Sequence, residues 1–100
     1  MMTIKDEIIY VAQPYGGNQE NYEKAKQTIT ALAKAYPDKC FISPILAFGH
    51  LYEDMSYDEG MELCYTLLDV CSELWALGDS EGVRREKEYA ARYKIPIREI

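Results

Sequence analysis

The sequence predicts a small Rossmann-like or flavodoxin-like α/β domain with three layers and a four-stranded parallel sheet in the order 2-1-3-4. Two observations lead to this fold class. Short apolar runs alternate with segments of helical periodicity, and turns that contain glycine or proline separate them. Alternating strands and helices imply right-handed crossovers, which place helices on both faces of a parallel sheet. The 100 residues suffice for one domain only, so a single domain over residues 1–100 is expected.

Each element follows from its local pattern. Pro37 stops the first helix, in which apolar residues recur at intervals of three and four. Pro44 favours an edge position for the second strand, because proline cannot donate to a sheet ladder. The expected elements are a strand at 7–13, a helix from a cap at Asn18 or Asn21 to Tyr36, a strand at 40–46, a loop at 47–56, a helix at 57–71, a strand at 73–77, a helix at 83–93 and a strand at 95–100.

The strand order locates a ligand cleft. In open α/β sheets, ligands bind outside the carboxyl ends of the strands where the order reverses, here between the first and third strands. Two glycine-containing loops meet there and open helices, whose N-termini favour anions. Gly16 and Gly17 lack the G-x-G-x-x-G spacing of dinucleotide sites, and a simple turn explains them equally well. The candidate ligand-binding residues are Gln13, Pro14, Tyr15, Gly16, Gly17, Asp79, Ser80, Gly82, Val83 and Glu86.

Composition and charge exclude several classes of function. With 48% hydrophobic and 28% charged residues the chain is typical of a globular domain. Its net charge of −6 argues against binding a nucleic acid polymer. The charge is uneven, since residues 53–81 hold nine acids and no base, whereas residues 84–98 hold six bases and two acids. The longest uncharged stretch, residues 40–52, is too short and too polar for a membrane span, so a cytoplasmic location is expected.

Few of the remaining side chains suggest chemistry. Cys40, Cys64 and Cys71 lack a metal-ligand pattern, and we expect buried thiols in a reducing compartment. Neither a metal nor a cofactor is expected. Trp75 is expected in the core, and His50 in a cleft-lining or surface position. Aromatic residues near the strand ends can stack on a base or pack between subunits; they are Tyr15, Phe48, Tyr52 and Tyr57.

Glu86 is the candidate for chemistry in the predicted third helix. At helical spacing it shares a face with Gly82 and Tyr89, toward the strand ends. An acid near a helix start also compensates the helix dipole. It can equally join an exposed network with its neighbours Arg84, Arg85, Lys87 and Glu88.

Three segments together resemble the nucleoside 2-deoxyribosyltransferase-like superfamily, which includes nucleotide N-glycoside hydrolases and many small phage proteins. They are residues 10–17 (YVAQPYGG), residues 42–45 (ISPI) and residues 80–86 (SEGVRRE) with the following Ala90. The Ser-x-Gly-x-x-x-Glu pattern is the most specific part. The resemblance implies that Glu86 attacks the anomeric carbon as a nucleophile and that Tyr10 helps to position it. It also implies that the loop at residues 80–82 holds phosphate or sugar hydroxyls.

The chain departs from that resemblance at two positions. Catalytic members carry an aspartate in the helix before the third strand and another just before that strand, which align here with Cys64 and Ser72. A thiol, which titrates near ~8.5, replaces a carboxylic acid poorly. General acid assistance to a departing base is worth about 10²–10⁴-fold. The nearby acids Asp58, Glu59 and Asp79 are the alternatives for this role.

We therefore expect the domain to bind a nucleotide- or ADP-ribose-type small molecule without turnover, as a homo-oligomer in which a neighbour completes each pocket. A phage origin fits the size and the resemblance, and sequestering a host nucleotide immune signal would then be an anti-defence role. One alternative is an N-glycosidase or deoxyribosyltransferase that acts on a nucleoside or nucleoside monophosphate through Glu86 and Tyr10. Another is an adaptor whose acidic residues 53–81 bind a basic protein.

Overall fold

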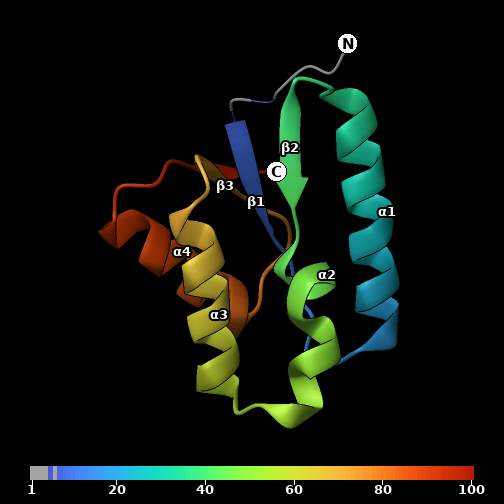
Figure 1. Cartoon of the computed structure of the whole chain (residues 1–100), viewed down its shortest axis with the longest axis vertical. Helices are drawn as coiled ribbons and strands as arrows, with labels where there is room; N and C mark the ends of the chain where they lie inside the picture. Colours follow the sequence, from blue (N-terminus) through green and yellow to red (C-terminus); the bar gives the residue numbers. More distant parts are fainter. Residues whose placement is uncertain (1–4, 6) are drawn as a thin grey trace.

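The computed structural model describes Lys5 and residues 7–100 and contains one four-stranded parallel sheet. Its order, β2-β1-β3-β4, confirms the predicted α/β class and strand order (Figure 1). The predicted domain also includes residues 1–4 and 6, which lie outside the described residues. The elements are β1 (Glu7–Ala12), α1 (Gln19–Ala35), β2 (Lys39–Ile42), α2 (Pro44–Phe48), the 3-10 helix η1 (Gly49–Asp54), α3 (Tyr57–Asp69), β3 (Glu73–Ala76), α4 (Glu81–Arg92) and β4 (Ile97–Glu99).

Helices cover both faces of the sheet. On the α1 side, the rings of Tyr36 and Phe41 pack edge-on against Trp75, with centroids 5.1 and 5.2 Å away. Trp75 is 1% exposed, so its predicted place in the core is confirmed. On the opposite side, α3 and α4 contribute to one buried cluster with the sheet. Its members are Tyr10, Ala12, Leu68, Cys71, Leu74, Ala76, Val83 and Ala90.

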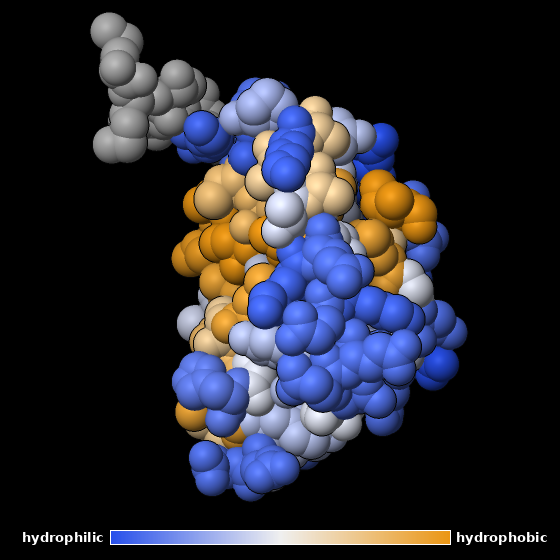
Figure 2. Space-filling view, turned by 90° about the vertical axis from the view of Figure 1, so that its right-hand side faces the viewer, coloured by the Kyte–Doolittle hydropathy of each residue, from blue (hydrophilic) through white to orange (hydrophobic). Residues whose placement is uncertain are grey.

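The outer surface of α1 is hydrophilic. Figure 2 looks onto this side of the molecule and shows hydrophilic residues over its middle, with hydrophobic patches to either side. Only Ala25 of α1 is fully buried, which is typical of an amphipathic surface helix. Among the described residues, every helix is too short or too polar to cross a membrane.

Polar side chains cap the helices that surround the strand ends. Asn18, one of the two predicted caps, accepts a hydrogen bond from the backbone N–H of Asn21 at the start of α1. Ser56 and Glu59 form a reciprocal capping box at the start of α3. The Ser80 hydroxyl accepts from the backbone N–H of Val83, 3.1 Å away, at the start of α4. These bonds satisfy N–H groups that a helix leaves unpaired.

Two predictions between residues 40 and 56 are wrong. The second strand ends at Ile42 rather than residue 46, and residues 44–54, predicted as the end of a strand and a loop, form α2 and η1. Pro44 occupies the first turn of α2, where its missing N–H costs nothing. The buried Ser43 caps this helix by accepting from the backbone N–H of Leu46.

The predicted burial of the cysteines holds for two of the three positions. Cys71 is buried, and Cys64, a residue of α3, is partly buried against the core cluster. Cys40 is exposed, which contradicts the prediction. The reason is that β2 is an edge strand, so one side of it faces solvent.

Candidate functional site

A pocket of about 590 Å³ opens at the carboxyl ends of β1 and β3, where the strand order places the topological switch. Small-molecule sites range from roughly 300 to 1,000 Å³. One side, which we call the polar wall, consists of residues 13–16 after β1 and of Ser80–Gly82 and Glu86 from the start of α4. The other side, which we call the apolar wall, comes from α2, η1 and α3.

Seven of the ten candidate ligand-binding residues line the pocket; they are Gln13, Pro14, Tyr15, Gly16, Ser80, Gly82 and Glu86. The structure places the other three elsewhere. Gly17 is exposed, does not line the pocket, and lies against the ring of Tyr52. Asp79 is exposed and pairs with Arg84 at 3.0 Å, and Val83 is fully buried in the core.

The two loops of the polar wall meet through a glycine. Gly78 has a φ of +81°, a left-handed conformation that suits glycine. A Cβ atom at Gly78 would lie 3.2 Å from Cδ of Pro14, so the position has little room for a side chain. The prediction that the loops after β1 and β3 converge is therefore confirmed by direct contact.

Glu86 lies at the floor of the pocket. Its side chain is 4% exposed, so it does not belong to an exposed network on α4. The Tyr10 hydroxyl donates a hydrogen bond to Oε2 of Glu86. Burial raises the pKa of Glu86 to about 7, while the bond from Tyr10 acts in the opposite direction. Near neutral pH the carboxyl group is therefore divided between its protonated and ionised forms.

Cys64, a partly buried residue, is the third group beside Glu86. Burial, and then the charge of Glu86, raises the pKa of the Cys64 thiol to about 11. Burial also raises the pKa of Tyr10 well above its usual value, and Glu86 adds to this effect. Both groups are therefore neutral near pH 7. The carboxyl group of Glu86, which can gain or lose a proton, therefore lies beside two neutral hydrogen-bonding groups.

The structure places other acids away from the pocket floor. Asp58 pairs with Arg85 at 3.2 Å, and Glu59 caps α3. Ser72 precedes β3, at the end of the sheet opposite the pocket, where its hydroxyl accepts from the backbone N–H of Ile8. Glu81, an exposed residue, is the second acid of the pocket lining. The residues that line the pocket include no lysine, arginine or histidine.

Aromatic contacts attach the apolar wall to the polar wall. The ring of Tyr52 packs edge-on against Tyr15, with centroids 5.4 Å apart. The Tyr15 hydroxyl donates to the backbone carbonyl of Gly49 at 3.3 Å. Tyr57 is half exposed at the rim, and its ring lies under the guanidinium group of Arg85.

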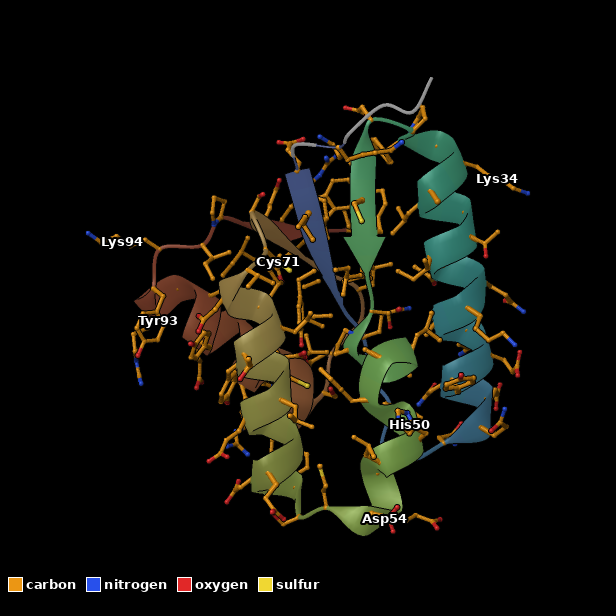
Figure 3. The ribbon with its side chains drawn as sticks, viewed as in Figure 1. Lys34, His50, Asp54, Cys71, Tyr93 and Lys94 are labelled. Atoms are coloured by element: carbon orange, nitrogen blue, oxygen red, sulfur yellow. The ribbon has the colours of Figure 1, made fainter. Side chains whose placement is uncertain are left out.

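Sequence reasoning found only the aromatic part of the apolar wall. Phe48, Tyr52 and Tyr57 line the pocket, as their places near the strand ends suggest. Exposed His50, on η1, is not among the lining residues (Figure 3). The Ser43-Pro44 pair, a cap followed by a first-turn proline, is the signal that could have revealed α2. The missed lining residues are Asn21, Pro44, Ile45, Gly49, Leu51, Met55, Ser56, Gly60, Met61, Leu63, Cys64 and Glu81.

The described residues offer no arrangement for a bound metal. Over Lys5 and residues 7–100, no three or more His, Cys, Asp or Glu side chains group in a way that could hold an ion. The polar groups at the pocket are the carboxyl group of Glu86, the hydroxyl groups of Tyr10 and Ser80 and the backbone N–H groups at the start of α4.

The fold and the pocket define a Rossmann-like parallel α/β domain with a concave site at its topological switch. Residues 7–100 match the profile of a family described as a domain of unknown function (DUF7768), and the chain belongs to that family. No curated protein matches the sequence.

Proposed function

We propose that this domain binds a nucleotide- or ADP-ribose-type small molecule in its pocket and returns it chemically unchanged. The observation that carries this proposal is the composition of the pocket. An aromatic wall, a buried carboxyl group and a helix N-terminus surround one space of about 590 Å³. The aromatic side chains match a flat base, the carboxyl group matches a hydroxylated sugar, and the helix N-terminus matches an anionic group. The resemblance to the nucleoside 2-deoxyribosyltransferase-like superfamily supports the same class of ligand.

The aromatic side chains of the apolar wall suit a nucleobase. Phe48, Tyr52 and Tyr57 come from three consecutive elements and all line the pocket. Stacking of a base on an aromatic ring is worth about 1–3 kcal/mol and depends little on which base is present. We therefore assign the base to the apolar wall.

Glu86 suits the hydroxyl groups of a ribose. The ionised carboxylate accepts hydrogen bonds through its oxygens, and the protonated form also donates one. Because Tyr10 already donates to Oε2, a hydroxyl group of the ligand would meet Oε1. This assignment places the sugar over the pocket floor, between the base and α4.

The start of α4 is the place for an anionic group. Among the residues that the structure describes, no cationic side chain lines the pocket, so backbone N–H groups and the helix dipole have to supply the attraction. The Ser80 hydroxyl oxygen is occupied by the N–H of Val83, but its own proton remains free to donate. Gly82 lines the pocket, and a Cβ atom there would lie 3.2 Å from the Tyr57 hydroxyl, so this hydroxyl group lies close to the start of α4. This arrangement favours one phosphate at the pocket rim.

Return of the ligand unchanged follows from the acids of the pocket. Enzymes that cleave glycosidic bonds generally use two carboxyl groups, one of them to protonate the leaving group. Here Glu86 lies on the floor, and the second lining acid, Glu81, is exposed in the first turn of α4. Cys64 occupies the position that the resemblance gives to an aspartate. On this proposal the protein sequesters its ligand.

An N-glycosidase or deoxyribosyltransferase is the second candidate, and the Tyr10–Glu86 hydrogen bond favours it. In such a reaction the Glu86 carboxylate bonds to the anomeric carbon, the carbon–nitrogen bond breaks, and the base leaves with the electron pair and gains a proton. Chromatography after incubation with excess protein separates the candidates. Intact ligand with the wild type supports sequestration, whereas free base released by the wild type but not by Glu86→Gln supports the enzyme.

A thermal-shift panel tests binding itself. Ligand at 100 times its dissociation constant stabilises the folded state by about 2.7 kcal/mol. At this chain length, each kcal/mol raises the melting temperature by roughly 4–8 °C. We expect at least one clear rise among nucleosides, nucleoside monophosphates, ADP-ribose and cyclic ADP-ribose isomers. A panel without any rise would contradict the proposal and favour a protein-binding role.

A further inference from the structure

The side chains that line the pocket include acids but no bases, although the ligand proposed above is anionic. Among the residues that the structure describes, every titratable side chain of the lining is an acid. A phosphate group in the pocket therefore comes near carboxyl groups without meeting a cationic side chain. The lining acids are the carboxyl groups of Glu81 and Glu86, the thiol of Cys64 and the phenols of Tyr15, Tyr52 and Tyr57.

The basic side chains of α4 that flank Glu86 in the sequence do not change this balance. None of them lines the pocket, and each is paired with an acid outside the pocket lining. Their charges are therefore largely offset before a ligand arrives. The pairs are Arg84 with Asp79 at 3.0 Å, Arg85 with Asp58 at 3.2 Å and Lys87 with Glu99 at 2.7 Å.

Glu86 has one oxygen atom that can take a proton toward the pocket. Tyr10, from β1, donates to Oε2, and no hydrogen bond from the described residues reaches Oε1. From α3, Glu86 faces the Cys64 thiol and the Tyr57 phenol. Burial is the main cause of the raised pKa of each of these groups, and the charge of Glu86 adds to both shifts. The groups around Glu86 are therefore neutral and offer its carboxylate no positive charge.

We propose that Glu86 takes up a proton from solvent when an anionic ligand binds, so that the affinity for a phosphate-bearing ligand falls as the pH rises above neutral. This inference rests on the function proposed above and concerns how the same site is regulated. The proton comes from the buffer and bonds to Oε1, and the carboxylate becomes a carboxylic acid. The charge of Glu86 then no longer opposes the charge of the ligand.

Two physical effects of the ligand favour this uptake. A ligand that fills the pocket excludes water from the pocket floor, and the loss of hydration disfavours an ionised carboxylate. A negative charge on the ligand disfavours it further, because like charges repel. Burial already raises the pKa of Glu86 to about 7 in the free protein, against the opposing effect of Tyr10. At pH 7.5 more than half of the free protein is therefore ionised at Glu86 and can gain a proton.

The hydrogen bond proposed for a ribose is compatible with both forms of Glu86. An ionised Oε1 accepts from a sugar hydroxyl, and a protonated Oε1 donates to the oxygen of the same hydroxyl. The phosphate group differs, because its charge favours the protonated form alone. Proton uptake should therefore be larger for a nucleoside monophosphate than for the nucleoside with the same base.

Isothermal titration calorimetry in two buffers of different ionisation enthalpy measures the number of protons taken up. The anionic probes are AMP, GMP, CMP, UMP and ADP-ribose, and the parent nucleosides are their uncharged counterparts. At pH 7.5 we expect about half a proton or more for each anionic probe that binds, and less for its nucleoside. The Kd of the anionic probe should rise at least about fivefold between pH 6.5 and pH 8.5.

Glu86→Gln keeps the size of the side chain and cannot change its charge. It should lose the proton uptake and bind the anionic probe more tightly than the wild type at pH 8.5. The phosphate itself also titrates, with a second pKa of about 6, and any uptake from this source would persist in the variant. Glu62→Gln, at an exposed position of α3 outside the pocket lining, is the matched control and should keep both the uptake and the pH dependence.

The outcomes separate this inference from the proposed function. Three results would each overturn the inference alone: binding of an anionic probe without proton uptake, uptake that persists in Glu86→Gln, or equal uptake for a monophosphate and its nucleoside. A complete lack of binding by every probe would instead overturn the proposed function, and the inference with it. Uptake that depends on Glu86 and on the charge of the probe would support both.

Discussion

The two walls of the pocket differ in how they are held. The polar wall follows directly from paired strands, and the Ser80 hydroxyl fixes the start of α4 through a 3.1 Å bond to the Val83 N–H. The apolar wall joins it through the edge-on contact of Tyr15 with Tyr52 and a 3.3 Å hydrogen bond to Gly49. The polar wall, which the sheet holds in place, thus carries the carboxyl group and the helix N-terminus. The apolar wall, which side-chain packing holds in place, determines the shape of the pocket.

The two walls should respond differently to mutation. Changes in the apolar wall should alter packing, and with it both stability and pocket shape. Changes at Glu86 should alter charge while the fold remains. Changes where the walls touch, at Gly17 and Tyr52, should have smaller effects that depend on both residues.

Ile45→Ala should have the largest effect. Ile45 is 4% exposed, belongs to α2 and lines the pocket, so its truncation removes buried contacts and enlarges the cavity. We expect a loss of about 2–5 kcal/mol in the free energy of unfolding, measured by urea denaturation. Val70→Ala, at an exposed position, is the control and should change it by less than about 0.5 kcal/mol. An equally small loss for Ile45→Ala would mean that α2 does not hold the wall.

Glu86→Gln should change how stability depends on pH. Burial raises the pKa of Glu86 from 4.5 to about 7, so the folded state binds more protons than the unfolded state between these values. Wild-type stability should therefore fall as the pH rises from about 4.5 to about 7, by up to about 3 kcal/mol in total. The glutamine variant should lack this fall and be the more stable protein at pH 8.

Glu59→Gln should change the pH dependence of stability in the opposite direction to Glu86→Gln. The hydrogen bonds with Ser56 lower the pKa of Glu59, so its carboxylate stabilises the fold above the unfolded pKa, and this contribution is lost as the pH falls. Replacement of Glu59 by glutamine should therefore reduce stability at neutral pH.

Urea denaturation from pH 4 to pH 8 compares Glu86→Gln and Glu59→Gln with the wild type. Parallel pH profiles for Glu86→Gln and the wild type would contradict the burial of a titrating carboxyl group.

Gly17→Ala against Gly16→Ala measures the contact between the walls. Both glycines have positive φ, +73° and +62°, so alanine at either costs about 1–2 kcal/mol. Only at Gly17 would the new Cβ lie 2.6 Å from the Tyr52 ring, whereas Gly16 has nothing within 4 Å. Gly17→Ala should thus be the more destabilising in thermal melts. The difference should vanish in a Tyr52→Ala background, and its persistence there would place the strain elsewhere.

The two walls also differ in how well the sequence predicts them. The strands, the polar wall and the core position of Trp75 follow from apolar runs, glycine turns and caps, which are local signals. The α2 part of the apolar wall is not predicted, because the Ser43-Pro44 pair fits both an edge strand and a helix start. Only tertiary packing distinguishes the two, since it buries Ile45 against the pocket.

Contacts between distant residues were also beyond local patterns. Tyr10 and Glu86 are 76 positions apart, and only the family resemblance suggested that they act together. Val83, predicted as a ligand contact, is fully buried and belongs to the core cluster instead. Helical spacing locates a face, whereas burial decides which residues of that face remain accessible.

The most direct test of the two-wall account is a nuclear magnetic resonance titration of the ¹⁵N-labelled protein with the compound that gives the largest thermal shift. The account predicts amide shifts in both walls, at Gly16 and Gly82 on one side and at Phe48 and Tyr52 on the other, with none at Arg92. Shifts confined to one wall, or centred on the outer surface of α3 and α4, would contradict a ligand site between the walls.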